Sequence, residues 1–85
     1  MLDDEFLKEF GLQLKFYRIK KGLTQAQLGD RVEISEHRLS EIERGRCNLT
    51  LKTVNKLANA LNVDVSKFFK FEDSNSDIIL RFSSN

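Results

Sequence analysis

The chain has 85 residues, 40% of them hydrophobic, and a net charge of +1 at pH 7, which allows one small domain and makes oligomerisation a natural source of added stability. No apolar run approaches the roughly 20 residues of a membrane span, and residues 1–5 are too acidic for a signal peptide, so we expect a cytoplasmic protein without membrane contact. One cysteine and one histidine exclude an internal disulfide and leave too few ligands for a Cys/His metal site, so no metal or cofactor is expected.

Residues 3–21 are expected to form the first helix. Apolar residues recur there at helical spacing and predict a stripe that faces the core: Phe6, Phe10, Leu14 and Tyr17. Phe16 falls off this stripe and is expected at the surface. Gly22 is expected to end the helix.

Two short helices are expected next, at residues 25–32 and 36–44. Thr24 and Ser35 precede them, and each can cap a helix because its side-chain oxygen accepts hydrogen bonds from the free N–H groups of the first turn. Gly45 ends the second helix. Each helix carries one apolar stripe, formed by Leu28, Val32, Leu39 and Ile42. Two capped helices joined in this way predict a helix-turn-helix, whose core flanking helices must complete.

Two further segments are expected to close that core. A helix over residues 51–61 places on one face Leu51, Val54, Leu57, Ala58 and Leu61. Ser66 is expected to cap a short fifth helix that contains Phe68 and Phe69. At least one of these two rings belongs in the core, and the other is expected, with Val65, at a dimer contact.

The sequence divides into a domain over residues 1–71 and a C-terminal extension over residues 72–85. The extension begins with a polar linker and continues into a β-prone apolar run that contains Ile78, Ile79, Leu80 and Phe82. An exposed run of this kind invites pairing, so one interpretation is a contact across a two-fold axis. Packing against its own subunit and a disordered end are the alternatives.

Charge is distributed unevenly along the chain. Residues 11–70 carry twelve Lys/Arg and six Asp/Glu, whereas the two ends together carry two basic and seven acidic residues. A basic middle is typical of a domain that meets a polyanion on one face, although an ordinary solvated surface can have the same composition.

The stretch from Thr24 to Gly45, TQAQLGDRVEISEHRLSEIERG, resembles the phage-repressor (Cro/C1-type, or XRE) helix-turn-helix family. The resemblance covers residues 12–69 and includes the downstream pattern Leu57-Ala58-x-Ala60-Leu61-x-Val63. It implies an all-α, five-helix, lambda-repressor-like DNA-binding domain with a short C-terminal extension. Residues 46–50, RCNLT, are similar to the restriction-modification controller proteins within this family.

By this resemblance, the helix over residues 36–44 reads the major groove of DNA. The candidate base readers are Glu36, His37 and Glu41. The candidates nearer the phosphates are Ser35 and Arg38. A glutamate accepts a hydrogen bond from cytosine N4, and a histidine donates to guanine. Alternatively, Glu36 only complements the helix dipole, and Glu41 pairs with an arginine three residues away, Arg38 or Arg44.

The resemblance also implies contacts with the DNA backbone around this helix. Gln25 is expected to touch a phosphate, the alternative being an exposed residue without a contact. Basic and polar residues after the reading helix are expected to continue this surface: Arg44, Arg46, Asn48, Thr50 and Lys52. Cys47 in the same loop is either a redox switch or a silent thiol.

Three positions concern how the family's helices are held. The resemblance implies that Arg18 pairs with Glu43 and ties the first helix to the end of the reading helix, the alternative being two independent surface charges. Gly29, where the family usually has alanine, is expected to allow a close helix crossing. Glu33 stands where the family commonly has glycine at positive φ. A residue other than glycine in that backbone conformation costs on the order of 1–2 kcal/mol. Either this strain is tolerated or the turn has another shape.

These observations predict a sequence-specific DNA-binding transcriptional regulator. We expect a homodimer on palindromic double-stranded operators, because one reading helix spans few base pairs and half-sites lie about 34 Å apart. The length leaves no second domain for a small-molecule effector, and no catalytic cluster or glycine-rich phosphate loop suggests an enzyme. The alternative is a protein-interaction module, antitoxin-like or adaptor, because Glu36 and Glu41 oppose phosphate attraction.

Overall fold

A computed structural model describes residues 3–71, which form four α-helices and a short 3-10 helix and contain no strand. The elements in chain order are α1 (Asp3–Lys20), α2 (Gln25–Val32), α3 (Glu36–Glu43), α4 (Leu51–Leu61) and the 3-10 helix η1 (Val65–Phe69). The all-α prediction is confirmed, and the fifth helix is of the 3-10 type. The C-terminal extension lies outside the described residues.

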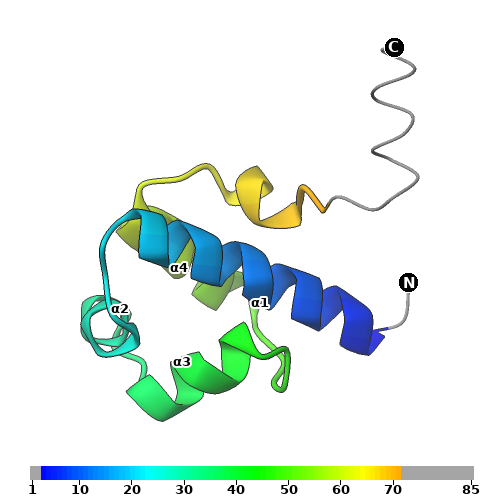
Figure 1. Cartoon of the computed structure of the whole chain (residues 1–85), viewed down its shortest axis with the longest axis horizontal. Helices are drawn as coiled ribbons and strands as arrows, with labels where there is room; N and C mark the ends of the chain where they lie inside the picture. The colour runs from blue at the N-terminus through cyan, green and yellow to red at the C-terminus, as the bar shows by residue number, and fades with distance from the viewer. Residues whose placement is uncertain (1–2, 72–85) are drawn as a thin grey trace.

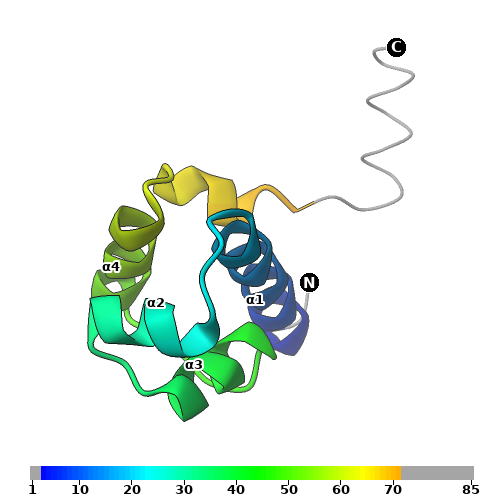
Figure 2. The same cartoon turned by 60° about the vertical axis from the view of Figure 1, so that its left-hand side comes forward.

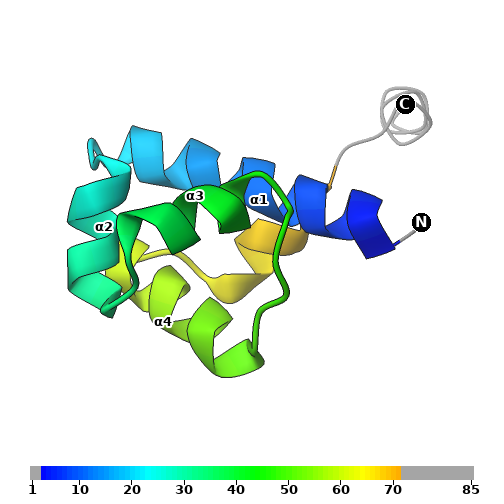
Figure 3. The same cartoon turned by 90° about the horizontal axis from the view of Figure 1, so that it is seen from below.

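The helices are arranged in a ring around one core (Figure 2). α1 packs against both α3 and η1, which lie on opposite sides of it in Figure 1, while α2 packs against α3 and α4. Seen from below, α3 lies in front of α1 (Figure 3), so one side of α3 faces away from the domain. The buried apolar side chains are Phe10, Leu14, Leu28, Val32, Leu39, Ile42, Val54, Leu57, Ala58, Leu61 and Phe68.

Two residues predicted for the core lie at the surface. Phe6 is 42% exposed and stacks on Phe69 with ring centroids 5.8 Å apart, because the first turns of α1 extend past the core (Figure 1). Leu51 is 83% exposed at the first position of α4, before the helix reaches the core. Phe16, expected at the surface, is 55% exposed. The predicted helical stripes are therefore correct in their middle and too long at their N-terminal ends.

The turn between α2 and α3 keeps a left-handed residue at its centre. Glu33 has φ 61° and ψ 44°, so of the two alternatives the strained backbone is the one adopted. The Ile34 N–H donates to the Gly29 carbonyl oxygen over 2.9 Å and closes the turn. A Cβ at position 29 would collide with the Ile34 carbonyl oxygen, so the missing side chain allows this close approach.

The cap of η1 differs from the prediction. Asp64, not Ser66, is the N-cap, and its Oδ1 accepts a hydrogen bond of 2.9 Å from the Ser66 N–H. That hydrogen bond favours the charged carboxylate and lowers the pKa of Asp64 below its ordinary value of 3.8. Both residues have side chains that can cap, but only Asp64 stands before the first turn.

The predicted dimer residues fall into three groups. Phe68 is fully buried among the core residues, so of the two rings it is the one that belongs to the core, and it is not available as a dimer contact. Val65 and Phe69 are 39% and 38% exposed, and both remain available to a partner. The other predicted dimer residues lie outside the described range: Ile78, Ile79, Leu80 and Phe82.

Candidate nucleic-acid interface

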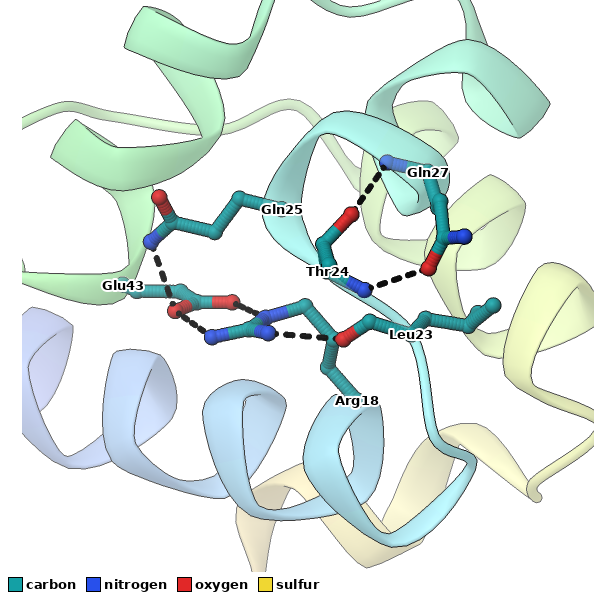
Figure 4. A network of polar contacts seen from close by, with 6 residues as sticks. All are labelled: Arg18, Leu23, Thr24, Gln25, Gln27 and Glu43. Carbon is teal, nitrogen blue, oxygen red and sulfur yellow. Dashed lines mark hydrogen bonds and ion pairs between the residues drawn. The ribbon is translucent and has the colours of Figure 1, made fainter.

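A buried ion pair fixes the C-terminal end of α3 to α1. Arg18 Nε donates to Glu43 Oε2 over 2.6 Å, and Nη2 donates to Oε1 over 3.0 Å, in the two-pronged geometry typical of strong guanidinium–carboxylate pairs (Figure 4). The third guanidinium nitrogen, Nη1, donates to the Leu23 carbonyl oxygen over 2.8 Å. The Arg18 and Glu43 side chains are only 10% and 3% exposed, so they are not two independent surface charges.

Gln25 brings α2 to the same carboxylate. Its Nε2 donates to Glu43 Oε1 over 3.0 Å, while its Oε1 points away from the ion pair (Figure 4). The start of α2 is held by a reciprocal cap, in which Thr24 Oγ1 accepts from the Gln27 N–H and the Thr24 N–H donates to Gln27 Oε1. The contact between Gln25 and Glu43 was not predicted, and it makes Glu43 the point where α1, α2 and α3 meet.

The backbones of α1 and the end of α3 also approach closely. A Cβ on Gly11 would collide with the Glu43 carbonyl oxygen, and a Cβ on Gly45 would lie 2.6 Å from the Lys8 nitrogen. Gly45 also needs its freedom of conformation, because it has φ +75° where the chain turns out of α3. Its N–H donates to the Ile42 carbonyl oxygen over 3.0 Å. Glycine on both sides of the contact therefore lets α3 lie directly against α1.

The opposite side of α3 is open to solvent. Leu39 and Ile42 point inward with 0% and 1% exposure, and the first-turn residues that face outward are Glu36, His37 and Arg38, all exposed. Ser35 caps the helix, since its Oγ accepts from the Arg38 N–H over 3.0 Å. Three of the predicted base-reading and phosphate residues are thus accessible to solvent on the first turn of α3.

The remaining candidate base reader is engaged within its own helix. Glu41 Oε2 lies 3.6 Å from Arg44 Nη1, so of the two possible arginine partners the structure contains the pair with Arg44. The two side chains are 27% and 58% exposed, and a pair of this kind contributes about 0.2–1 kcal/mol or less. Such a pair opens at little cost, so both residues remain accessible to a ligand.

The predicted backbone-contacting residues after α3 are exposed: Arg44, Arg46, Asn48, Thr50 and Lys52. Thr50 caps α4, because its Oγ1 accepts from the Thr53 N–H over 3.1 Å, and the same hydroxyl lies 3.1 Å from Thr53 Oγ1. Its hydroxyl is therefore already engaged inside the protein. Cys47 is a free, half-buried thiol in the same loop.

A groove between α1 and α3, of about 660 Å³, was not predicted. It is lined by Lys8, Leu12, Lys15, Gln25, Ser40, Glu43, Arg44 and Arg46. The sequence contains one signal for it: Lys8 and Lys15 are seven residues apart and so share a face of the helix. That this face borders α3 follows only from the tertiary structure.

Two kinds of site are not found in the described part of the chain. Within residues 3–71, no group of three or more His, Cys, Asp and Glu side chains lies together as a metal site requires. None of the helices in this range has the length and apolar composition needed to cross a membrane.

A capped pair of helices whose second member faces solvent, braced by a first helix, defines a helix-turn-helix domain. Residues 9–67 match the family model described as a helix-turn-helix domain. Over 56 residues the chain is 39% identical to the immunity repressor protein of Bacillus phage phi105, a match that covers 66% of this chain and 39% of the repressor. Over 61 residues it is 33% identical to an uncharacterized HTH-type transcriptional regulator of Methanocaldococcus jannaschii, covering 72% of this chain and 92% of that protein.

Among solved structures, the restriction-modification controller protein C.AhdI from Aeromonas hydrophila superimposes with a TM-score of 0.75 and 32% identity, covering 78% of this chain and 96% of that one. The chain therefore belongs to the helix-turn-helix family of Cro/C1-type (XRE) transcriptional regulators. The family consists of DNA-binding regulators and not of enzymes.

Proposed function

We propose that this regulator binds palindromic operators as a homodimer and reads their sequence with the outer face of α3. The observation that carries the proposal is the contrast between the two sides of α3. The side of α3 that faces α1 is fixed by the buried ion pair of Glu43 and Arg18, while Glu36 and His37 are exposed on the first turn of α3. A reading helix needs this combination, because base edges are discriminated only by side chains held in a defined position.

Each exposed residue has a chemical role in this proposal. Glu36 accepts from cytosine N4, and His37 donates to guanine. Glu41 joins the readout when its weak pair with Arg44 opens. The residues assigned to the phosphates are Gln25, Ser35, Arg38, Arg44, Arg46, Asn48 and Lys52, whereas Thr50 could join them only by giving up the hydrogen bond that its hydroxyl donates to Thr53. Gln25 is supported in this role by its position at the start of α2, where one N–H of its amide donates to Glu43 and the second N–H of the same NH2 group is left to donate to a phosphate.

The dimer interface is proposed on the face formed by η1 and the start of α1. Phe6, Phe69 and Phe71 form an aromatic cluster there, with Phe6 and Phe71 ring centroids 5.4 Å apart. Val65, 39% exposed, belongs to the same short helix as Phe69. We assign the apolar run of the extension, Ile78, Ile79, Leu80 and Phe82, to the same interface. Because η1 lies across α1 from α3 (Figure 1), pairing through this face leaves both reading helices free.

Selection of binding sites from a random duplex library tests this proposal. The wild-type chain is expected to select a palindrome with half-sites about 34 Å apart. Glu36→Gln is expected to change the preferred base at one position of each half-site. The matched control Asp30→Asn, an exposed carboxylate on α2, is expected to leave the selected sequence unchanged.

Three results would count against parts of the proposal. An unchanged preference in Glu36→Gln removes this residue from the readout. A selected sequence without two-fold symmetry rejects the dimeric mode of binding. No binding to duplex DNA, or binding that does not weaken as salt rises, rejects the whole proposal and favours a protein-interaction module.

A further inference from the structure

The α1/α3 groove, lined by Lys8, Leu12, Lys15, Gln25, Ser40, Glu43, Arg44 and Arg46, contains more positive charge than the protein neutralises. We propose that it is a phosphodiester-binding site, in which Lys8 and Lys15 of α1 hold the DNA strand that borders the reading helix. The inference rests on the proposed function and adds α1 to the surface that meets DNA. Neither the resemblance nor the exposed face of α3 assigns a contact to these two lysines.

The groove has an excess of positive charge, which is the first reason to expect that it binds an anion. The one carboxylate in its lining, Glu43, is already paired with Arg18 and accepts a further hydrogen bond from Gln25. Within residues 3–71, neither lysine belongs to an ion pair, and Arg46 has none either. Arg44 has only its exposed 3.6 Å contact with Glu41. Four cations thus line one groove without a buried counter-charge, which favours an anion from outside the protein.

The geometry of α1 carries the second step. Lys8 and Lys15 are two helical turns apart, roughly 10 Å along the axis, which is far enough for them to meet different phosphates of one DNA strand. Leu12 lies between them on the same side of the helix and also lines the groove. The groove therefore presents a row of charge along α1 that suits an extended polyanion better than a single small ion.

The position of the groove beside α3 carries the third step. Gln25 and Arg44, both assigned to the DNA backbone, also line the groove, so this surface continues without interruption onto α1. Figure 3 shows α1 running alongside α3. When α3 enters a major groove, one backbone strand must pass along each of its sides. The side next to α1 is the one that Lys8 and Lys15 border.

Another lysine-lined hollow of the domain, away from α3, provides a matched control. Lys21 and Lys67 line it together with Tyr17, Asn62 and Asp64, at the end of the domain where α4 leads into η1. This hollow contains the Asp64 carboxylate and does not include a residue of α3. Removing these two charges changes the net charge of the protein as much as removing those of Lys8 and Lys15.

The test compares Lys8→Gln/Lys15→Gln with Lys21→Gln/Lys67→Gln in the full chain. Binding to the selected duplex is measured over a range of potassium chloride concentrations. Each phosphate contact that is lost lowers the slope of log K against log salt by about 1, so the groove variant is expected to lose about 2 and the control much less. Sequence preference is expected to stay the same in both variants, because phosphates carry no base identity.

Two further measurements make the result decisive. Ethylation interference on the same duplex is expected to show phosphates beside α3 that matter for the wild-type chain and no longer matter for the groove variant. Lys8→Arg/Lys15→Arg, which keeps both charges, is expected to restore the salt slope and excludes loss of folding as the cause.

The possible failures can be told apart. If the wild-type chain binds DNA with a steep salt slope and the groove variant keeps that slope, the α1 site is wrong while the proposed function stands. A changed base preference in the groove variant would also overturn it, since the lysines would then act on the readout. If the wild-type chain does not bind duplex DNA, both proposals fall together.

Discussion

The two ends of α3 are held in different ways. At the C-terminal end, the buried carboxylate of Glu43 is bound by Arg18 and Gln25, and the α3 backbone lies against Gly11. At the N-terminal end, the exposed Ser35 provides a cap, and the left-handed turn at Glu33 sets the direction of the chain. One end is fixed by buried charge and tertiary contact, and the other mainly by local backbone geometry.

This difference predicts how each end responds to substitution. A change at the C-terminal end leaves a buried polar group without its partner or forces two backbones apart, and both are costly. A change at the N-terminal end affects a solvated turn, where energies are small. Substitutions of the residues that hold the two ends in place, as distinct from the proposed base readers, should therefore differ in their effect on unfolding free energy and leave the preferred bases largely unchanged.

The largest effect is expected from removing the charge of Glu43. Glu43→Gln keeps the shape of the side chain but leaves the Arg18 guanidinium buried without a counter-charge. Losing one partner of a buried pair costs about 3–5 kcal/mol, so the free energy of unfolding measured with urea is expected to fall by about 3 kcal/mol.

Glu41→Gln is the matched control for this variant. It makes the same chemical change two residues away, where the pair with Arg44 is 3.6 Å long and exposed, so a loss below about 1 kcal/mol is expected. Equal losses in the two variants would mean that burial adds nothing to the Glu43 pair. Arg18→Ala is expected to resemble Glu43→Gln, lowering stability more than it alters sequence preference.

An intermediate effect is expected from Gly11→Ala. Alanine improves helix propensity by about 1 kcal/mol, but the added Cβ would collide with the Glu43 carbonyl oxygen, a backbone atom that cannot rotate away. Overpacking of this kind costs about 1–3 kcal/mol, so urea denaturation is expected to show a net loss of about 1 kcal/mol. A gain in stability would show that α1 and α3 separate without cost.

The helices are predictable from the sequence because local signals specify them. The bounds of α2 and α4 agree with the prediction, since Thr24 and Thr50 cap them and apolar stripes continue to their last residues. The ends of α1 and α3 are each predicted one residue too far, at Lys21 and Arg44. The sequence does not show that the core stops short of Phe6, because that depends on where η1 crosses α1.

The candidate site is less predictable than the fold. The pairing of Arg18 with Glu43 follows from the family resemblance and is present in the structure. The hydrogen bond from Gln25 to Glu43 and the groove beside Lys8 and Lys15 have no such source, because both need α1, α2 and α3 in their final positions. Local patterns specify which residues are exposed on one helix, and only the packing of helices decides which exposed residues meet.

The smallest effect is expected from the turn at the N-terminal end of α3. Glu33→Gly removes a left-handed strain of about 1–2 kcal/mol, and the greater freedom of glycine in the unfolded chain offsets about 0.4–1 kcal/mol of that gain. The free energy of unfolding is therefore expected to rise by roughly 0.5–1 kcal/mol, with no change in the selected DNA sequence.

Asn62→Gly gives the comparison that interprets this result. Asn62 follows α4 with φ 56° and ψ 44°, nearly the same conformation as Glu33, but asparagine tolerates the left-handed region better than glutamate. Its replacement is therefore expected to gain less than Glu33→Gly. If Asn62→Gly gains as much, glutamate is no more strained than asparagine in this conformation. If Glu33→Gly destabilises the protein, the Glu33 side chain must itself stabilise the turn that directs α3 outward.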